Sequence, residues 1–359
     1  MSSSAASGPG RSHLSTPALV VDLDVFEANV AAMDRLLEGS GKTVRPHVKT
    51  HRTPELARRQ LGGHSRGVTC ATVGEAEAMA AAGIGDILVA NEVVDPAKLA
   101  RIVALAATAR VTIAADDPVP VAALSAAAVA AGVEIGVLVD VDILLGRCGV
   151  TSPTEAVRLG AAIDRSPGLR LEGVMGYEGR LRADADDRAA RIGTAYDRLA
   201  EAHAALRAAG LASRGVVSAA GTSTLTEALA DPTITEIQAG VYALMEPQLL
   251  PLGLPFRCAA SVRGTVISRR PGRAILDVGR RSIGLEYGLP LPALTGAIVA
   301  GVNDEHTILE TVDPPPLGSQ VDLVPGQVRT TFNLHDSVWL ARRGDLLERW
   351  PVSARGRSD

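Results

Sequence analysis

Short apolar runs alternate with alanine-rich stretches over the first two thirds of the chain. The runs are rich in Val, Ile and Leu, as buried strands are, whereas stretches such as 73–82 and 153–163 space their apolar residues as helices do. Strands that alternate with helices favour a parallel sheet. The eight strand-like runs lie at residues 44–50, 67–72, 86–91, 110–115, 134–140, 171–177, 215–220 and 235–242.

Eight such units predict a (β/α)8 barrel over residues 16–250, since that fold typically takes about 250 residues. A helix that starts at Asp24, with Glu27 three residues on as a capping box, is expected before the first strand. The rival architecture is a doubly wound open sheet. It is disfavoured because no Gly-x-Gly-x-x-Gly follows the first run.

The pattern changes after residue 250. Shorter alternating runs at 261–268, 273–278, 321–324, 330–334 and 337–342 are separated by turn signals at 270–272 and 343–345. Residues 251–350 are therefore predicted to form a C-terminal antiparallel β domain. The segments 1–15 and 351–359 lie outside both patterns, and we expect them to be disordered.

Composition narrows the class of protein. The chain has 359 residues, 47% of them hydrophobic and 21% charged, and a net charge of −4, which attracts neither nucleic acid nor anionic membranes. No apolar run reaches the roughly 18 residues of a membrane span. The three cysteines are unclustered, and residues 1–15 lack the apolar core of a signal peptide. We expect a soluble cytoplasmic protein with reduced thiols.

Lys49 is the first candidate for chemistry, because it stands at the end of an apolar, strand-like run. Burial disfavours the ammonium form and makes the neutral amine available as a nucleophile. Lysines of this kind form Schiff bases with carbonyls, including that of pyridoxal 5'-phosphate (PLP). A basic surface turn is the alternative, since Arg45, His47 and His51 crowd the same stretch.

The ends of the seventh and eighth runs are candidates for phosphate binding. Barrel enzymes carry their sites at the carboxyl ends of the strands, and phosphate is often held after strands seven and eight. Residues 218–224 offer small side chains, hydroxyls and backbone N–H groups, as an anion site requires, and residues 238–242 follow the eighth run. The alternative is that the Ser and Thr residues only cap the next helix.

Residues 45–51, Arg-Pro-His-Val-Lys-Thr-His, resemble the PLP-lysine motif of the D-threonine aldolase and D-serine dehydratase family. The likeness runs from about residue 16 to 347 and includes the segments 67–76, 87–94, 146–150, 176–179, 235–240 and 333–336. Members are fold-type III PLP enzymes with an alanine-racemase-like barrel and a C-terminal β domain. The resemblance implies a PLP enzyme with a small amino-acid substrate, and a homodimer.

The resemblance also implies roles for single residues. Lys49 would form the internal aldimine with PLP and act as the base at the substrate Cα. Arg147 would contact the phenolic oxygen of the PLP ring, and Tyr177 would pack beside the cofactor. Without the resemblance, Arg147 reads as a salt-bridge residue and Tyr177 as a core residue. The expected phosphate and cofactor contacts are Gly221, Thr222, Gln238, Gly240 and Tyr242.

The chain departs from the family pattern where the family binds a divalent metal. That metal is held by a His-x-Cys or His-x-Asp pair shortly before an Asn-Leu-His-Asp segment, here 333–336. The flanking residues align without a gap, so Gln327 and Arg329 stand at the ligand positions. Glutamine is a weak ligand and arginine cannot lose its proton, so we expect no metal. Leu144 is a second departure, because the arginine segment usually has glycine there.

The loss of the metal leaves the role of Arg329 open, since the family metal polarises the substrate's β-hydroxyl. Arg329 either replaces the metal as a fixed positive charge, or binds an anionic group of a different substrate, or fills the empty site with a salt bridge. His335, beside Asp336, is the expected acid or base opposite Lys49, ahead of His306.

These inferences predict a metal-independent PLP lyase, similar to an aldolase or dehydratase, that acts on a small D- or β-hydroxy amino acid. An amino-acid racemase or epimerase is the alternative. A PLP-binding regulatory protein is a second alternative, which the additional β domain disfavours because such proteins are usually a bare barrel.

Overall fold

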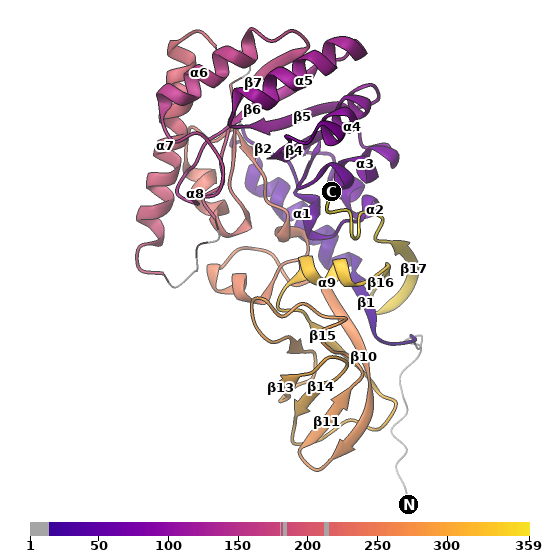
Figure 1. Ribbon diagram of the computed structural model, residues 1–359. Coiled ribbons are helices and arrows are strands. Elements are labelled where there is room, and N and C mark those ends of the chain that lie inside the picture. The colour runs from indigo at the N-terminus through magenta and orange to yellow at the C-terminus, as the bar shows by residue number, and fades with distance from the viewer. Residues whose placement is uncertain (1–13, 180, 182–184, 212–214) are drawn as a thin grey trace, which may run out of the picture. The chain divides into compact units, whose positions relative to one another are not determined.

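The computed structural model describes residues 14–179, 181, 185–211 and 215–359, and Figure 1 shows its helices and strands. The chain divides into two compact units. Unit 1 comprises the residues up to Asn29, Leu244–Leu250 and Phe256–Val352. Unit 2 comprises Val30–Ala243, Pro251–Pro255 and Ser353–Asp359.

Unit 2 contains eight parallel strands in the order β2-β9-β8-β7-β6-β5-β4-β3. Isolated parallel bridges from Val44 to Ser65 and from His47 to Thr69 join the two ends of that order. The predicted barrel class is confirmed. The strands are β2 Thr43–Val44, β3 Val68–Cys70, β4 Asp86–Glu92, β5 Arg110–Ala115, β6 Ile135–Asp140, β7 Leu169–Met175, β8 Val216–Ala219 and β9 Glu236–Ile237.

Helices connect these strands and pack outside them (Figure 1). Several begin with a proline after a side-chain cap: Asp95, Asp117 and Ser152 each accept a backbone N–H of the following turn. These signals fix where each strand-to-helix loop ends. The helices are α2 Pro54–Gln60, α3 Val73–Ala81, α4 Pro96–Ala106, α5 Pro118–Ala131, α6 Pro153–Asp164, α7 Arg188–Ala208 and α8 Leu225–Ala230.

The first and last barrel strands are shorter than the apolar runs predicted. Residues 48–50 form a 3-10 helix, η1 (Val48–Thr50), so Lys49 lies beyond the strand and not at its end. Pro46 has no N–H to donate to a strand ladder, and the N–H groups of Thr50 and His51 turn back to the carbonyls of His47 and Val48. Residues after Ile237 likewise leave the sheet, and 241–243 form a second 3-10 turn, η3 (Val241–Ala243).

The barrel interior is apolar in the middle and charged at the amino ends of the strands. Leu88, Ala114, Leu138 and Met175, from four successive strands, form a buried cluster. Arg45 pairs with Asp86 at 2.6 Å and with Glu236 at 2.8 Å, and both acids are the first residues of their strands. The charged end is a structural plug, which leaves the opposite end for chemistry.

Unit 1 is a nine-stranded sheet with the main order β13-β14-β11-β10-β1-β16-β17, in which β15 pairs with β10 and β12. β1 (Ala18–Asp22) is antiparallel to β10 and parallel to β16, so residues 18–22 belong to this sheet and not to the predicted barrel segment 16–250. The remaining strands are β10 Ala260–Arg270, β11 Arg273–Leu276, β12 Leu291–Pro292, β13 Ile298–Val302, β14 Thr307–Glu310, β15 Gln320–Val324, β16 Ser337–Arg342 and β17 Asp345–Pro351.

Two local predictions were wrong in unit 1. α1 (Leu23–Leu37) is capped by Asp22, whose carboxylate accepts the Val25 N–H at 3.1 Å, because Asp24 and Glu27 are both drawn to Arg342. The run 330–334 lies in a helix, α9 (Val328–Leu334), and not in a strand. Buried Val328 and Phe332 are spaced four apart, as on a helix face.

The tail predicted to be disordered is ordered over 353–359. The Ala354 N–H donates to the Arg52 carbonyl, and the Asp359 carbonyl accepts the Gly74 N–H at 2.8 Å at the start of α3. The Asp359 carboxylate also pairs with Arg101. These contacts hold the tail in place, so the prediction of disorder for it was wrong. The other predicted disordered segment lies outside the described residues over 1–13.

Candidate cofactor site at the carboxyl ends of the barrel strands

Lys49 is half-buried on η1, and its Nζ lies 5.9 Å from the centre of the Tyr177 ring. Tyr177 follows β7, so two loops far apart in sequence bring an amine and an aromatic face together. An ammonium over a ring gains up to about 2 kcal/mol when desolvated. The arrangement gives the Lys49 amine one apolar wall.

A buried acid also acts on Lys49. Burial raises the pKa of the Glu75 carboxyl most, while the Ala71 N–H and the charges of Arg52 and Lys49 lower it by less. Glu75 accepts the Ala71 N–H at 2.7 Å and pairs with Arg52 at 3.2 Å. Glu75 could not be singled out from the sequence, because an acid in the first turn of a helix such as α3 is common.

One predicted cofactor residue, Gly240, is a glycine whose lack of a side chain allows a close approach. A Cβ on Gly240 would stand 2.3 Å from the His47 carbonyl oxygen and 2.7 Å from the Thr50 hydroxyl, so only glycine fits against η1. Gly221 is different, because a Cβ there would make only an ordinary van der Waals contact, 3.5 Å from Tyr177 Cε2. The ends of β8 and β9 are therefore packed directly against the loops that carry Tyr177 and Lys49.

Thr222 and Tyr242 meet through the main chain. The Tyr242 N–H donates to Thr222 Oγ1 at 3.0 Å, and both residues are buried. Burial raises the pKa of the Tyr242 phenol, whose hydroxyl bonds Gln60 in the core. The structure therefore points the Tyr242 backbone, and not its hydroxyl, toward the Thr222 loop.

The side chain of Gln238 belongs to a row of hydrogen-bonded polar groups. Its Nε2 donates to Ser218 Oγ at 3.0 Å, and that hydroxyl donates to Glu236 at 2.7 Å. Glu236 in turn pairs with Arg45. The side chain of Gln238 is thus linked to the charged network of the barrel and holds β8 and β9 together.

Arg147 is exposed on the loop between β6 and α6. The Asp142 carboxylate holds that loop by accepting the N–H groups of Leu144 at 3.1 Å and Gly146 at 2.9 Å. The guanidinium charge lowers the pKa of the neighbouring Asp140 and Cys148, although burial raises both by more. Arg147 therefore lies on the same side of the barrel as the other strand-end groups.

Leu144 occupies a backbone conformation that favours glycine, with φ of 90°. Leu144→Gly should relieve backbone strain of about 1–3 kcal/mol in the folded protein. The glycine also gives the unfolded chain more conformational freedom, which costs about 0.5–1 kcal/mol of stability. We expect the free energy of unfolding, measured in urea, to rise by about 1 kcal/mol. Leu145→Gly, at a neighbouring residue of negative φ, should lower it instead. A Leu144→Gly protein less stable than the wild type would contradict this account of the loop.

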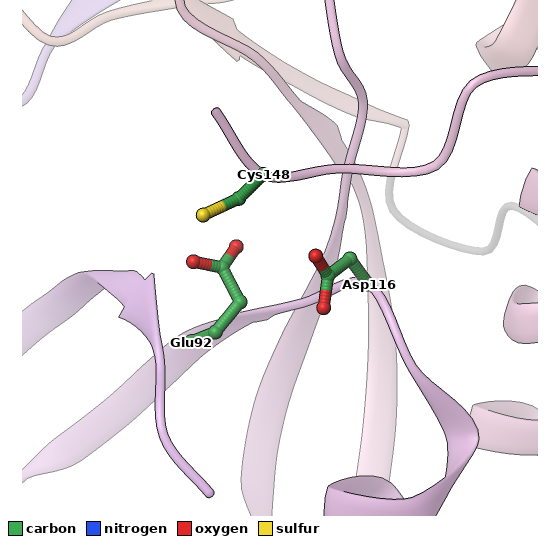
Figure 2. Close-up of side chains that lie close together, drawn as sticks. All are labelled: Glu92, Asp116 and Cys148. Atoms are coloured by element: carbon green, nitrogen blue, oxygen red, sulfur yellow. The ribbon is translucent and has the colours of Figure 1, made fainter. Parts of the chain in front are cut away.

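Glu92, Asp116 and Cys148 gather where β4, β5 and β6 end (Figure 2). Their ligand-type atoms all lie within 4.8 Å of one another. Burial, the hydrogen bond that the protonated Asp140 carboxyl donates to Glu92, and the Glu92 charge raise the pKa of Asp140 to about 8. Burial and Glu92 likewise raise the pKa of the Cys148 thiol to about 11. The Asp140 carboxyl and the Cys148 thiol therefore keep their protons at neutral pH.

Gln327 and Arg329 lie in unit 1, at the start of α9. The Gln327 side-chain oxygen accepts the Thr330 hydroxyl, so it is already occupied. The Arg329 guanidinium lies 5.4 Å from the centre of the Tyr287 ring. Its Nε is buried and has no hydrogen-bond partner among the described residues. The Gln327 amide oxygen already accepts a hydrogen bond, and Arg329 is permanently positive, so neither residue suits a divalent metal.

The two candidate histidines also lie in unit 1. His335 Nε2 lies 2.7 Å from the Ser282 carbonyl oxygen, which can only accept, so this nitrogen carries a proton. The contact ties the end of α9 to the segment after β11. His306 is exposed before β14. The role predicted for His335 as an acid or base stays a prediction.

Within unit 2 the structure gathers Lys49, Tyr177, Gly221 and Gly240, whereas Arg329 and His335 belong to the other unit. Sequence reasoning gave no role to Glu75, Glu92 or Glu178. Glu92 and Glu178 could have been noticed in the sequence, because each directly follows a strand-like run, 86–91 and 171–177. No described helix is both long and apolar enough to cross a bilayer.

Two family models match the chain. The model described as alanine racemase, N-terminal domain, matches residues 21–247. The model described as putative serine dehydratase domain matches residues 259–341. Together they cover most of both structural units.

Similar proteins agree with these matches. The chain is 38% identical to a D-threonine aldolase of Arthrobacter sp., over 98% of this chain and 95% of that protein. It is 35% identical to a 3-hydroxy-D-aspartate aldolase of Paracoccus denitrificans (strain Pd 1222), over 98% and 94%. A crystal structure of D-threonine aldolase from Filomicrobium marinum aligns with a TM-score of 0.91 and 37% identity, over 96% of this chain and 97% of that one.

Proposed function

The chain belongs to the alanine racemase N-terminal domain family and, within it, to the D-threonine aldolase group, and from that premise we propose that it is a PLP-dependent lyase that cleaves a small β-hydroxy D-amino acid. The observation that carries the proposal is the 38% identity to a D-threonine aldolase over 98% of the chain. The placement of Lys49 beside Tyr177 supports it independently.

The residues of unit 2 suit the cofactor. PLP needs an amine for its aldehyde, a flat wall for its ring and donors for its phosphate. Lys49 supplies the amine and Tyr177 the wall. Gly240 at the end of β9 leaves no room for a side chain, and Gly221 and the Thr222 hydroxyl follow β8. We assign the phosphate to this loop and the ring oxygen to Arg147.

Bound PLP would supply an electron sink for the bond that breaks at the substrate Cα. Residues of the protein would perform the other steps. The Lys49 amine anchors the cofactor and then accepts or returns the proton at Cα. Tyr177 would pack beside the cofactor ring next to the amine, and Glu75 is a buried acid whose charge interacts with that of Lys49. Arg147 would add a positive charge near the cofactor ring.

The metal found in the family does not fit the residues present here, so we derive no step through it. Gln327 and Arg329 replace the metal-binding pair. We propose that the Arg329 guanidinium binds the β-oxygen or a second anionic group of the substrate, because a buried Nε without a partner is a donor in need of an acceptor. His335 is the proposed proton donor or acceptor.

The lyase and the racemase make different products from the same Cα chemistry. The purified protein, loaded with PLP, is to be incubated in deuterated water with D- and L-threonine, D- and L-serine and D- and L-alanine. We expect D-threonine to yield glycine and acetaldehyde, with no inversion of alanine. Inversion and deuterium exchange in alanine, without cleavage of any hydroxy amino acid, would favour the racemase and refute the lyase.

Two further properties belong to the proposal. We propose a homodimer, as the family resemblance implies, and a cytoplasmic location, as the reduced and unclustered cysteines favour.

A further inference from the structure

Glu178 is a buried acid beneath the predicted phosphate loop. It follows Tyr177, and only 3% of its surface is exposed. Its Oε1 accepts the Thr224 hydroxyl and the Gly221 N–H, the latter at 3.4 Å. The Ala220 N–H also donates to the carboxyl. One side chain thus collects donors from three positions of the 220–224 loop.

The loop that these donors belong to is strained. Ala220 has φ of 69°, a left-handed conformation that costs a residue with a Cβ about 1–2 kcal/mol. A turn of this kind persists only when its surroundings hold it. The Glu178 carboxyl does so from the interior, and this leaves the outer face of the loop to the phosphate proposed above.

The charge of Glu178 conflicts with that phosphate. Its Oε2 is buried with no hydrogen-bond partner, and no lysine or arginine of the described residues pairs with the carboxyl. From α7, Tyr196 faces it and Arg188 is paired with Glu227 of α8. Burial raises the pKa of Glu178 by more than the donated hydrogen bonds lower it.

We propose that Glu178 is a positioning residue for the cofactor phosphate, which holds the 220–224 loop in its binding conformation and takes up a proton from solvent when the dianionic phosphate binds. The inference rests on the proposed function. An ionised carboxylate under a dianion would repel it, and that repulsion is strong in a buried setting. A proton on Oε2 removes the charge and leaves both contacts to Oε1 in place.

The proposal predicts the direction of a pH effect. Phosphate binding raises the pKa of Glu178 further, so between its free and bound pKa values the complex holds more protons than the free protein. In that window affinity for the phosphate falls as pH rises, by about tenfold per pH unit. Glu178→Gln keeps an acceptor oxygen for Gly221 and Thr224 but carries no charge, so it should lose the effect.

The test uses the apoprotein and pyridoxine 5'-phosphate, which lacks the aldehyde and cannot react with Lys49. Its dissociation constant is measured by calorimetry from pH 7 to 9 for the wild type, Glu178→Gln and Glu178→Ala. The ratio of wild type to Glu178→Gln cancels the titration of the ligand. We expect the glutamine variant to bind about tenfold tighter than the wild type at pH 9, with a flat profile. Glu178→Ala should bind about tenfold more weakly throughout.

A matched control is Glu172→Gln, at another buried glutamate of the same segment, on β7 and paired with Arg170. It should keep the wild-type affinity and pH profile. Parallel profiles for the wild type and Glu178→Gln would overturn the proton uptake, and wild-type affinity in Glu178→Ala would overturn the positioning role. Should Glu178→Ala fail to fold by circular dichroism, the glutamine profile decides.

Failure of the proposed function would look different. In that case the wild type itself would bind neither pyridoxine 5'-phosphate nor PLP. A wild type that binds both ligands, with Glu178 variants that behave like it, would overturn the role of Glu178 alone.

Discussion

Replacing Lys49 with alanine is expected to abolish the visible absorption of protein-bound PLP and to lower kcat/KM for D-threonine by on the order of 10⁴-fold or more. The reason is that Lys49 is the amine placed against the Tyr177 ring at the carboxyl ends of the strands. The measurements are the absorption spectrum of the protein after PLP loading and desalting, and the rate of glycine release from D-threonine.

The chain offers unusually clean controls, because its only other lysines are Lys42 and Lys98. Lys42 Nζ donates to the carbonyl oxygens of Asp231 and Ile234, at 2.5 and 2.6 Å. Lys42→Ala should therefore lower the melting temperature but keep the absorption band, and Lys98→Ala should change neither. After borohydride reduction, peptide mass spectrometry should find the PLP adduct on Lys49. An adduct on Lys42 or Lys98, or a coloured Lys49→Ala protein, would contradict the assignment.

The barrel could be predicted because its strands leave a local mark. All residues of β6 are buried, so the strand is apolar on both faces and stands out from the helices around it. The residues of β1 are also mostly apolar, but they do not indicate which strands β1 pairs with. Its partners β10 and β16 lie far along the chain. The composition of the sequence around Lys49 indicated a strand, whereas Pro46 and the close approach of Gly240 impose a 3-10 turn.

Site residues that lie in a sequence motif could be predicted, whereas side-chain directions that depend on packing could not. Lys49, Tyr177, Gly221 and Gly240 were predicted from the ends of the strand-like runs and from the family motifs, and the structure brings them together, while their roles stay predictions. The direction of the Tyr242 hydroxyl depends on Gln60, which lies on another element.

The acids that the sequence left unassigned show the same limit. The raised pKa of Asp140 depends on Glu92, which ends another strand and meets Asp140 only in the fold. No particular spacing along the sequence marks such a pair of acids, so the pair could not be predicted from the sequence.

Replacing Arg329 with alanine is expected to lower kcat/KM for the β-hydroxy D-amino acid by about 100-fold. That factor corresponds to the loss of charge-assisted hydrogen bonds worth about 2–3 kcal/mol. The Arg329 guanidinium lies 5.4 Å from the centre of the Tyr287 ring, and its buried Nε has no partner among the described residues. Arg329→Lys should recover only part of the loss, because an ammonium lacks the planar fork. Arg269→Ala, at an exposed arginine of the same unit, should match the wild type.

The same position tests whether the chain has exchanged a metal for a guanidinium. Wild-type activity should survive dialysis against a chelator and should not rise with manganese or zinc. The double variant Gln327→His, Arg329→Asp restores the His-x-Asp pair typical of the family, and carboxylate and imidazole ligands are those that such cations accept. It should bind one manganese or zinc ion per chain, measured by metal analysis after desalting, and its activity should become sensitive to chelator. Wild-type activity that vanishes with chelator and returns with manganese would show that the metal was kept and that Arg329 does not replace it.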